Sequence, residues 1–140
     1  SFEVDKLNLR RFVTFLGPYS RSDAPKIYQK VDAYITMSFQ DNCPSAVIEA
    51  MSCGLPILYS SSGGVPELVG KYAGIGLNVS EDWEKVNVPS KKEIYEGIIQ
   101  IIDKEKSFSH SARERAVKLF DIKLWIKRHE EVFELLLNNI

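Results

Sequence analysis

The chain has 140 residues, of which 44% are hydrophobic and 26% are charged, and its formal net charge is −1 at pH 7. These values are typical of one globular domain and exclude a disordered chain or a strongly basic nucleic-acid-binding protein. No apolar run approaches the roughly 20 residues that a transmembrane helix needs, and residues 1–20 lack the apolar core of a signal peptide.

The small numbers of cysteines and histidines limit the disulfides and metal sites that the chain can form. The two cysteines, Cys43 and Cys53, lie in apolar surroundings, which indicates reduced thiols in a cytoplasmic protein rather than a disulfide framework. With only two cysteines and two histidines, we expect no structural metal site.

Strand-like and helical segments alternate over the first 80 residues. Residues 2–9 are typical of the end of a helix. β-Branched and aromatic composition predicts four strands, at 11–17, 33–38, 55–60 and 74–79. Helical composition, with prolines near a first turn and glycines past an end, predicts helices at 23–30, 44–53 and 66–69.

The remaining residues are predicted to be mainly helical. The polar stretch 80–90 indicates a surface loop, and helices are expected at 91–104, 109–120 and 121–138. The last helix has an apolar stripe of period 3.6. This stripe consists of Ile122, Trp125, Ile126, Val132, Phe133, Leu136 and Leu137.

Strands separated by helices predict an α/β fold, Rossmann-like, with a mainly parallel sheet and flanking helices. In open sheets of this kind, ligands bind beyond the carboxyl ends of the strands. We therefore expect function in the loops at 18–22, 39–44 and 60–66.

Glu49 is the one formally charged side chain between residues 42 and 66, and its predicted helix is apolar on most faces. A carboxylate in such surroundings is costly unless it is satisfied. Glu49 either pairs with a protein N–H or cation, points outward, or accepts hydrogen bonds from a polyol ligand. The 2′ and 3′ hydroxyls of a ribose suit a carboxylate well.

Asp41 lies eight residues earlier, in the loop before that helix. One interpretation is that Asp41 or Asn42 caps the helix, which is common chemistry. The alternative is that the Asp41 carboxylate faces the cleft and contacts a sugar hydroxyl.

Gly63 and Gly64 join a predicted strand to a helix start. Two glycines let the backbone approach a ligand closely, and a helix N-terminus favours phosphate. A glycine pair is also routine in turns, so both interpretations stay open. The spacing matches neither a P-loop nor a dinucleotide-binding fingerprint.

Residues 38–67 (SFQDNCPSAVIEAMSCGLPILYSSSGGVPE) resemble the donor-binding half of retaining glycosyltransferases of the GT-B fold. This large group, glycosyl transferases group 1, contains glycogen and sucrose synthases. Its pattern has two acidic residues separated by seven others, an E-A-M-A/S-x-G-x-P turn and then G-G-x-P-E. Here the acidic pair is Asp41 and Glu49, and the two motifs are at 49–56 and 63–67.

The resemblance implies a role for each matched position. Glu49 binds the ribose of the nucleotide, and Asp41 holds the transferred sugar as the catalytic-site carboxylate. The remaining donor-binding positions are Asn42, Cys43, Gly63, Gly64 and Val65, near the sugar and diphosphate, and Arg21, in the loop near the base. The donor is a nucleoside-diphosphate sugar, and no metal or other cofactor is implied.

The chain departs from the family pattern in two ways. Asp41 replaces the more usual Glu and residues 42–44 replace the usual Gly-Phe-Gly, which we interpret as a subtype. The family's donor domain also begins with two strands that carry a basic diphosphate clamp, preceded by an acceptor-binding domain, and neither is recognised here. With the family strand order 3-2-1-4-5-6, residues 1–140 supply strands 3 to 6 as a single partial domain.

The sequence thus predicts the donor-binding part of a retaining glycosyltransferase in polysaccharide or glycoconjugate biosynthesis. It transfers a sugar, of the hexosyl kind, from a nucleoside diphosphate to an acceptor hydroxyl. Without the clamp and the acceptor domain, we expect 1–140 to be inactive and to self-associate, or to be a piece of a longer chain. We expect a cytoplasmic location, with peripheral membrane association through the absent domain left open.

Two rival interpretations belong to other classes. The first is a non-catalytic nucleotide-binding or assembly module on the same fold. The second is an unrelated α/β regulatory domain, but the acidic phosphorylation pocket expected of it does not occur in the loops at the strand ends.

Overall fold

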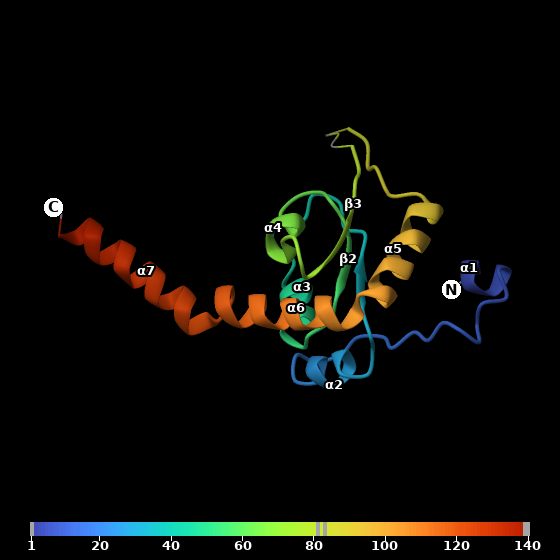
Figure 1. Ribbon diagram of the computed structural model, residues 1–140, viewed down its shortest axis with the longest axis horizontal. Helices are drawn as coiled ribbons and strands as arrows, with labels where there is room; N and C mark the ends of the chain where they lie inside the picture. The colour runs from blue at the N-terminus through green and yellow to red at the C-terminus, as the bar shows by residue number, and fades with distance from the viewer. Residues whose placement is uncertain (1, 81, 83, 139–140) are drawn as a thin grey trace.

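The computed structural model describes residues 2–80, 82 and 84–138, and in these it forms a small parallel sheet with helices on both faces (Figure 1). The sheet has strand order β1-β2-β3, and Tyr34, Ile57 and Gly74 are register partners across it. The strands are β1 (Tyr34–Thr36), β2 (Ile57–Ser60) and β3 (Gly74–Leu77). The helices are α1 (Phe2–Lys6), α2 (Ala24–Tyr28), α3 (Ser45–Ser52), α4 (Val65–Val69), α5 (Lys91–Asp103), α6 (Glu105–Leu119) and α7 (Ile122–Leu137).

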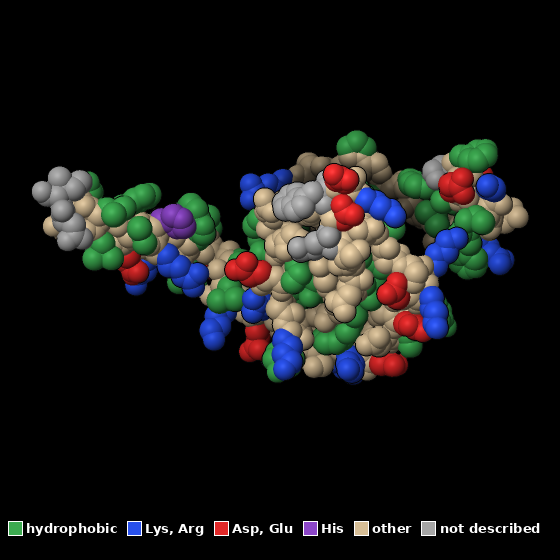
Figure 2. Space-filling view, turned by 90° about the horizontal axis from the view of Figure 1, so that it is seen from above, with side chains coloured by type: hydrophobic (Ala, Val, Ile, Leu, Met, Phe, Trp, Pro, Cys, Tyr) green, Lys and Arg blue, Asp and Glu red, His purple; other side chains and the backbone are tan. Residues whose placement is uncertain are grey.

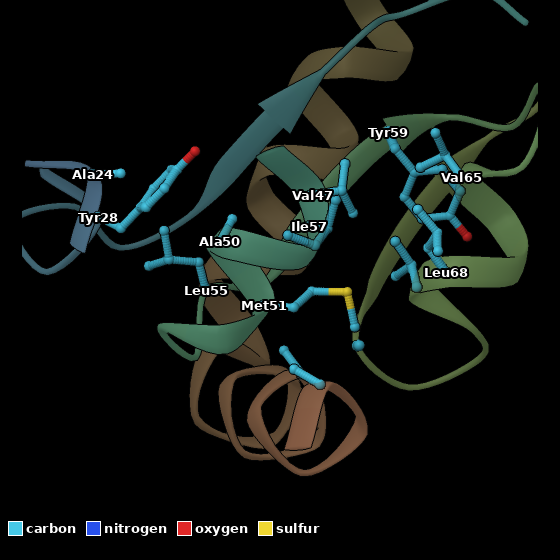
Figure 3. Packing of buried hydrophobic residues seen from close by; sticks show 14 residues of the cluster. Ala24, Tyr28, Val47, Ala50, Met51, Leu55, Ile57, Tyr59, Val65 and Leu68 are labelled. Carbon is cyan, nitrogen blue, oxygen red and sulfur yellow. The ribbon is translucent and has the colours of Figure 1, made fainter. Parts of the chain in front are cut away.

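The core has two parts because the side chains of β2 alternate between the faces of the sheet. Ile57 and Tyr59 pack with Val47 and Met51 of α3 and with residues of α2, α4 and α6 (Figure 3). Leu58 faces the opposite side, where a smaller cluster lies under α5 and the start of α6. Every residue of β2 is buried, as expected of a central parallel strand.

The predicted α/β class and parallel sheet are confirmed, with shorter elements than expected at most positions. The helix predicted at 44–53 is α3, which Gly54 follows with φ of 79°. The helix predicted from 109 begins earlier, at Glu105, and Lys104 is both the C-cap of α5 and the N-cap of α6. The loop predicted at 80–90 contains no helix or strand in the part described, and Glu81 and Trp83 lie outside the described residues.

The strand predicted at 11–17 is wrong. These residues follow an extended path between α1 and α2 without a partner strand (Figure 1). Phe12, Phe15 and Leu16 are each more than half exposed. A strand exists only where a neighbour completes its backbone hydrogen bonds, and the described sheet offers this segment none. The composition of residues 11–17 therefore indicates that they could form a strand, but it does not show whether a partner strand is present.

The C-terminal helix α7 projects as an arm from the rest of the fold (Figures 1 and 2). None of its described residues is buried, and the exposed side chains include Trp125, Ile126 and Phe133 of the predicted stripe. The helix has its own N-cap, since the Asp121 carboxylate accepts from the Lys123 N–H at 2.8 Å. The apolar stripe is thus helical as predicted but covers no part of this sheet.

Candidate functional site

The loops after β1 and β2 lie against each other at the carboxyl end of the sheet. The Gln40 N–H donates to Ser62 Oγ at 3.0 Å, and Ser62 Oγ donates to the Ser38 carbonyl at 3.4 Å. Ser62 is 1% exposed, so this connection is buried. Gln40 has φ of 54°, a conformation that side-chain-bearing residues rarely adopt. The Ser62 hydroxyl therefore fixes a strained turn beside the second loop.

Gly63 and Gly64 make this contact possible. A Cβ on Gly63 would lie 2.5 Å from the Asp41 carbonyl oxygen, and a Cβ on Gly64 would overlap the Asn42 carbonyl group. Gly63 also has φ of 60°, which favours glycine. The close approach that these glycines permit is therefore between the two loops themselves.

This packing limits which backbone N–H groups of the second loop are free to meet a phosphate. The Gly64 N–H donates to the Asp41 carbonyl oxygen at 2.9 Å, so it is already engaged and is not a free phosphate ligand. Among the described residues, the Gly63 and Val65 N–H groups make no hydrogen bond. Of the backbone amides at residues 63–65, these two stay available to donate to a phosphate.

Asp41 and Asn42 do not cap α3, because the N-cap residue is Pro44 and no side chain caps the helix. Instead, Asp41 Oδ1 accepts from the Cys43 N–H at 3.3 Å in a local turn. The second carboxylate oxygen has no hydrogen bond within the described residues. The half-buried Asp41 carboxylate thus keeps capacity to accept from a ligand at the sheet edge.

Glu49 is half-buried on α3, near tyrosines that come from α2 and β1. Burial raises the pKa of Tyr28, and the hydroxyl of Tyr19 and the negative charge of Glu49 raise it further. Burial likewise raises the pKa of Tyr34, with smaller contributions from Tyr19, Glu49 and Asp41. The negative charges of Glu49 and Asp41 thus both act on the half-buried Tyr34 hydroxyl.

The tyrosines themselves form a cluster that the sequence did not indicate. The Tyr28 and Tyr34 rings meet edge to face with centroids 6.0 Å apart, and the Tyr19 and Tyr28 hydroxyl oxygens are 3.5 Å apart. The buried Ser62 was also missed. Irregular spacing at 19, 28 and 34, and a serine within a polar run, carry no periodic signal, so only the fold brings these groups together.

The other predicted positions are distributed unevenly. Asn42 and Cys43 are exposed on the loop that meets Gly63 and Gly64. The Val65 side chain is 1% exposed and packs in the core, so only its backbone can face a ligand (Figure 3). Arg21 is exposed before α2 and makes no hydrogen bond or ion pair within the described residues.

The described part of the chain contains no group of three His, Cys, Asp or Glu side chains suited to a metal ion. None of the helices in the same part is both long and apolar enough to cross a membrane.

Comparison with known sequences gives one family. The family model of glycosyl transferases group 1 matches residues 1–118. The D-inositol 3-phosphate glycosyltransferases of Mycobacterium sp. strain KMS and Mycobacterium leprae strain TN are 34% and 32% identical over 66 residues. That stretch is 47% of this chain but 15% of each relative, so the match covers a small part of those proteins.

Solved structures with the same fold are also glycosyltransferases of the GT-B type. Sucrose-phosphate synthase from Thermosynechococcus elongatus superposes with a TM-score of 0.79 at 22% identity, covering 99% of this chain and 34% of that one. HepE from Anabaena, in complex with UDP and glucose, superposes with a TM-score of 0.72 at 23% identity, covering 95% and 35%. The chain therefore spans about a third of these structures and shares their fold.

Proposed function

Because the chain belongs to the glycosyl transferases group 1 family, we propose that it is the donor-binding part of a retaining glycosyltransferase. The observation that carries the proposal is the contact between the Asp41–Asn42 and Gly63–Gly64 backbones at the carboxyl end of the sheet. Ligands of open parallel sheets bind at that end. The structures of HepE in complex with UDP and with UDP-glucose support a nucleotide sugar as the ligand class.

In this proposal each carboxylate has a separate partner. Glu49 accepts from the ribose hydroxyls, while Asp41 accepts from a hydroxyl of the transferred sugar through the oxygen that its own loop leaves unused. The Gly63 and Val65 N–H groups donate to the diphosphate, and Asn42 and Cys43 line the sugar. Arg21 lies on the loop proposed to meet the base.

The reaction transfers a hexosyl group with retention. The bond from the anomeric carbon to the diphosphate oxygen breaks, and a bond to the acceptor hydroxyl oxygen forms on the same face. The hydroxyl proton passes to the leaving diphosphate. Residues 38–67 contain no Lys or Arg, so this part of the chain supplies N–H groups but no cation to stabilise the leaving diphosphate. We therefore propose that residues 1–140 bind the donor without catalysing transfer. The family resemblance separately implies no cofactor beyond the donor.

The test compares Glu49→Ala with Glu130→Ala, a matched loss of charge on the exposed α7. Removal of a charged hydrogen-bond acceptor should cost about 1.5–3 kcal/mol of UDP affinity in Glu49→Ala only. Calorimetric titration with UDP measures the affinity, and thermal melting reports the fold. If Glu49→Ala lowers the melting temperature while the folded protein binds UDP as tightly as Glu130→Ala does, Glu49 is a structural group.

The rival class is a nucleotide-binding module without catalysis. Incubation of the full-length protein with a nucleotide sugar and an acceptor separates the two. Release of the nucleoside diphosphate together with a glycoside of unchanged anomeric configuration supports the enzyme, whereas saturable donor binding without product supports the module.

A further inference from the structure

A second concave surface lies at the opposite end of the sheet from the candidate donor site. A pocket of about 800 Å³ lies between the turn that precedes β3 and the C-terminal half of α6. Lys71 and Tyr72 come from the turn, and Arg113, Arg115 and Lys118 come from α6. Because the turn leads into β3, this pocket is at the amino end of the strands, whereas the loops at 39–44 and 60–66 follow the carboxyl ends.

The pocket is cationic although the chain as a whole is slightly acidic. Four Lys or Arg side chains line the pocket, whereas Glu114 is the single carboxylate among its lining residues. The His110 Nε2 atom lies 3.5 Å from Glu114 Oε2, so the Glu114 carboxylate is next to a histidine on the same helix, α6. A local excess of positive charge in a concave surface attracts anions more strongly than the net charge suggests.

The two arginines are held in fixed orientations by carbonyl groups. Arg115 donates from Nε to the Leu68 carbonyl and from Nη2 to the Glu67 carbonyl, both at 2.7 Å. Arg113 donates from Nη1 to the Ser52 carbonyl. These carbonyls lie at the C-terminal ends of α4 and α3, where cations are favourable. These acceptors carry no formal charge, so neither guanidinium forms an ion pair within the described residues.

Two lysines and a tyrosine form the accessible rim. Lys71 and Lys118 are exposed and form no ion pair within the described residues. Tyr72 is 66% exposed, and Lys71 Nζ lies 5.5 Å from its ring centroid. The rim thus combines exposed cations with an aromatic ring that is not packed against the core.

We propose that this pocket binds a small molecule carrying a phosphate group next to an aromatic ring, independently of the candidate donor site. The phosphate lies among Lys71, Lys118 and Arg115, and the ring stacks on Tyr72. The volume is within the range of about 300–1,000 Å³ that small-molecule sites occupy. Both ligand features are needed, because the cations alone do not select among anions.

The test uses inorganic phosphate and phenyl phosphate as probes and follows backbone amide shifts of the full chain. We expect saturable shifts at 69–73 and 110–119, with phenyl phosphate binding more tightly. The double variant Lys71→Ala/Lys118→Ala should weaken both probes by about tenfold. Tyr72→Ala should weaken phenyl phosphate by about fivefold and leave inorganic phosphate unchanged.

A matched control removes two exposed lysines outside the pocket, as Lys85→Ala/Lys106→Ala, and should leave both affinities unchanged. Equal losses in the control and pocket double variants would show screening by overall charge and overturn the proposal. It is also overturned if the two probes bind equally well, or if the amide shifts do not saturate at 69–73 and 110–119.

Discussion

At Gly63, an experiment can separate two costs of adding a side chain, namely the strained backbone conformation and the steric clash with a neighbouring loop. Both Gly63 and Gly17 have φ near +60 to +70°, but a Cβ on Gly17 meets nothing within 4 Å, whereas one on Gly63 meets the Asp41 carbonyl. We predict that Gly63→Ala costs about 1–3 kcal/mol more unfolding free energy than Gly17→Ala. Denaturant unfolding of the two variants measures the difference. Equal costs would mean that the loops do not pack as the structure shows.

The glycine pair also shows how far sequence reasoning reaches at the scale of residues. The predicted topology put the loops at 39–44 and 60–66 at one edge of the sheet, because the loops that follow consecutive parallel strands lie at the same edge. The sequence could not show why glycine is required at residues 63 and 64. A missing side chain leaves room for a ligand, but it leaves room equally for another loop. That distinction depends on the Gln40 turn and the buried Ser62, which have no local signature.

At the scale of elements, local chemistry predicted helices better than strands. A helix satisfies its own backbone, so the caps and periodicity of α5 and α7 suffice to predict them. A strand needs a neighbouring strand for its backbone hydrogen bonds, and composition does not show whether one is present. Residues 11–17 have a strand composition but no partner in the described sheet, which is the largest error in the predicted fold.

The N-terminus of α5 offers a direct test of this local control. The Ser90 hydroxyl accepts from the Glu93 N–H at 3.3 Å, and Glu93 Oε2 accepts from the Ser90 N–H at 2.8 Å. We predict that Ser90→Ala lowers the unfolding free energy by about 1 kcal/mol. Ser107→Ala, at an exposed position within α6, is the control and should change it little. Unchanged stability in Ser90→Ala would mean that the capping box is absent in solution.

For the whole molecule, the distribution of apolar surface predicts association. Apolar side chains are exposed along α1, residues 11–17 and α7, and they include Phe12, Phe15, Trp125 and Phe133 (Figure 2). Large apolar side chains left exposed on such segments are typical of interaction surfaces. We predict that purified 1–140 self-associates, and that light scattering across a tenfold range of concentration shows a rising mean mass.

The matched variant carries Trp125→Lys and Phe133→Lys, both on α7, where no described residue is buried. It should fold and stay closer to a monomer over the same concentrations. A wild-type chain that remains monomeric and melts cooperatively throughout would contradict this prediction.

The central claim is that the carboxyl end of this sheet binds a nucleoside diphosphate. Titration of the 1–140 chain with UDP and, separately, with uridine, followed by backbone amide shifts, tests it directly. We predict saturable shifts in the loops at 39–44 and 60–66 with UDP, much smaller shifts there with uridine, and loss of the UDP response in Glu49→Ala. If titration with UDP leaves both loops unperturbed, the chain does not bind this nucleotide where its fold and motifs indicate.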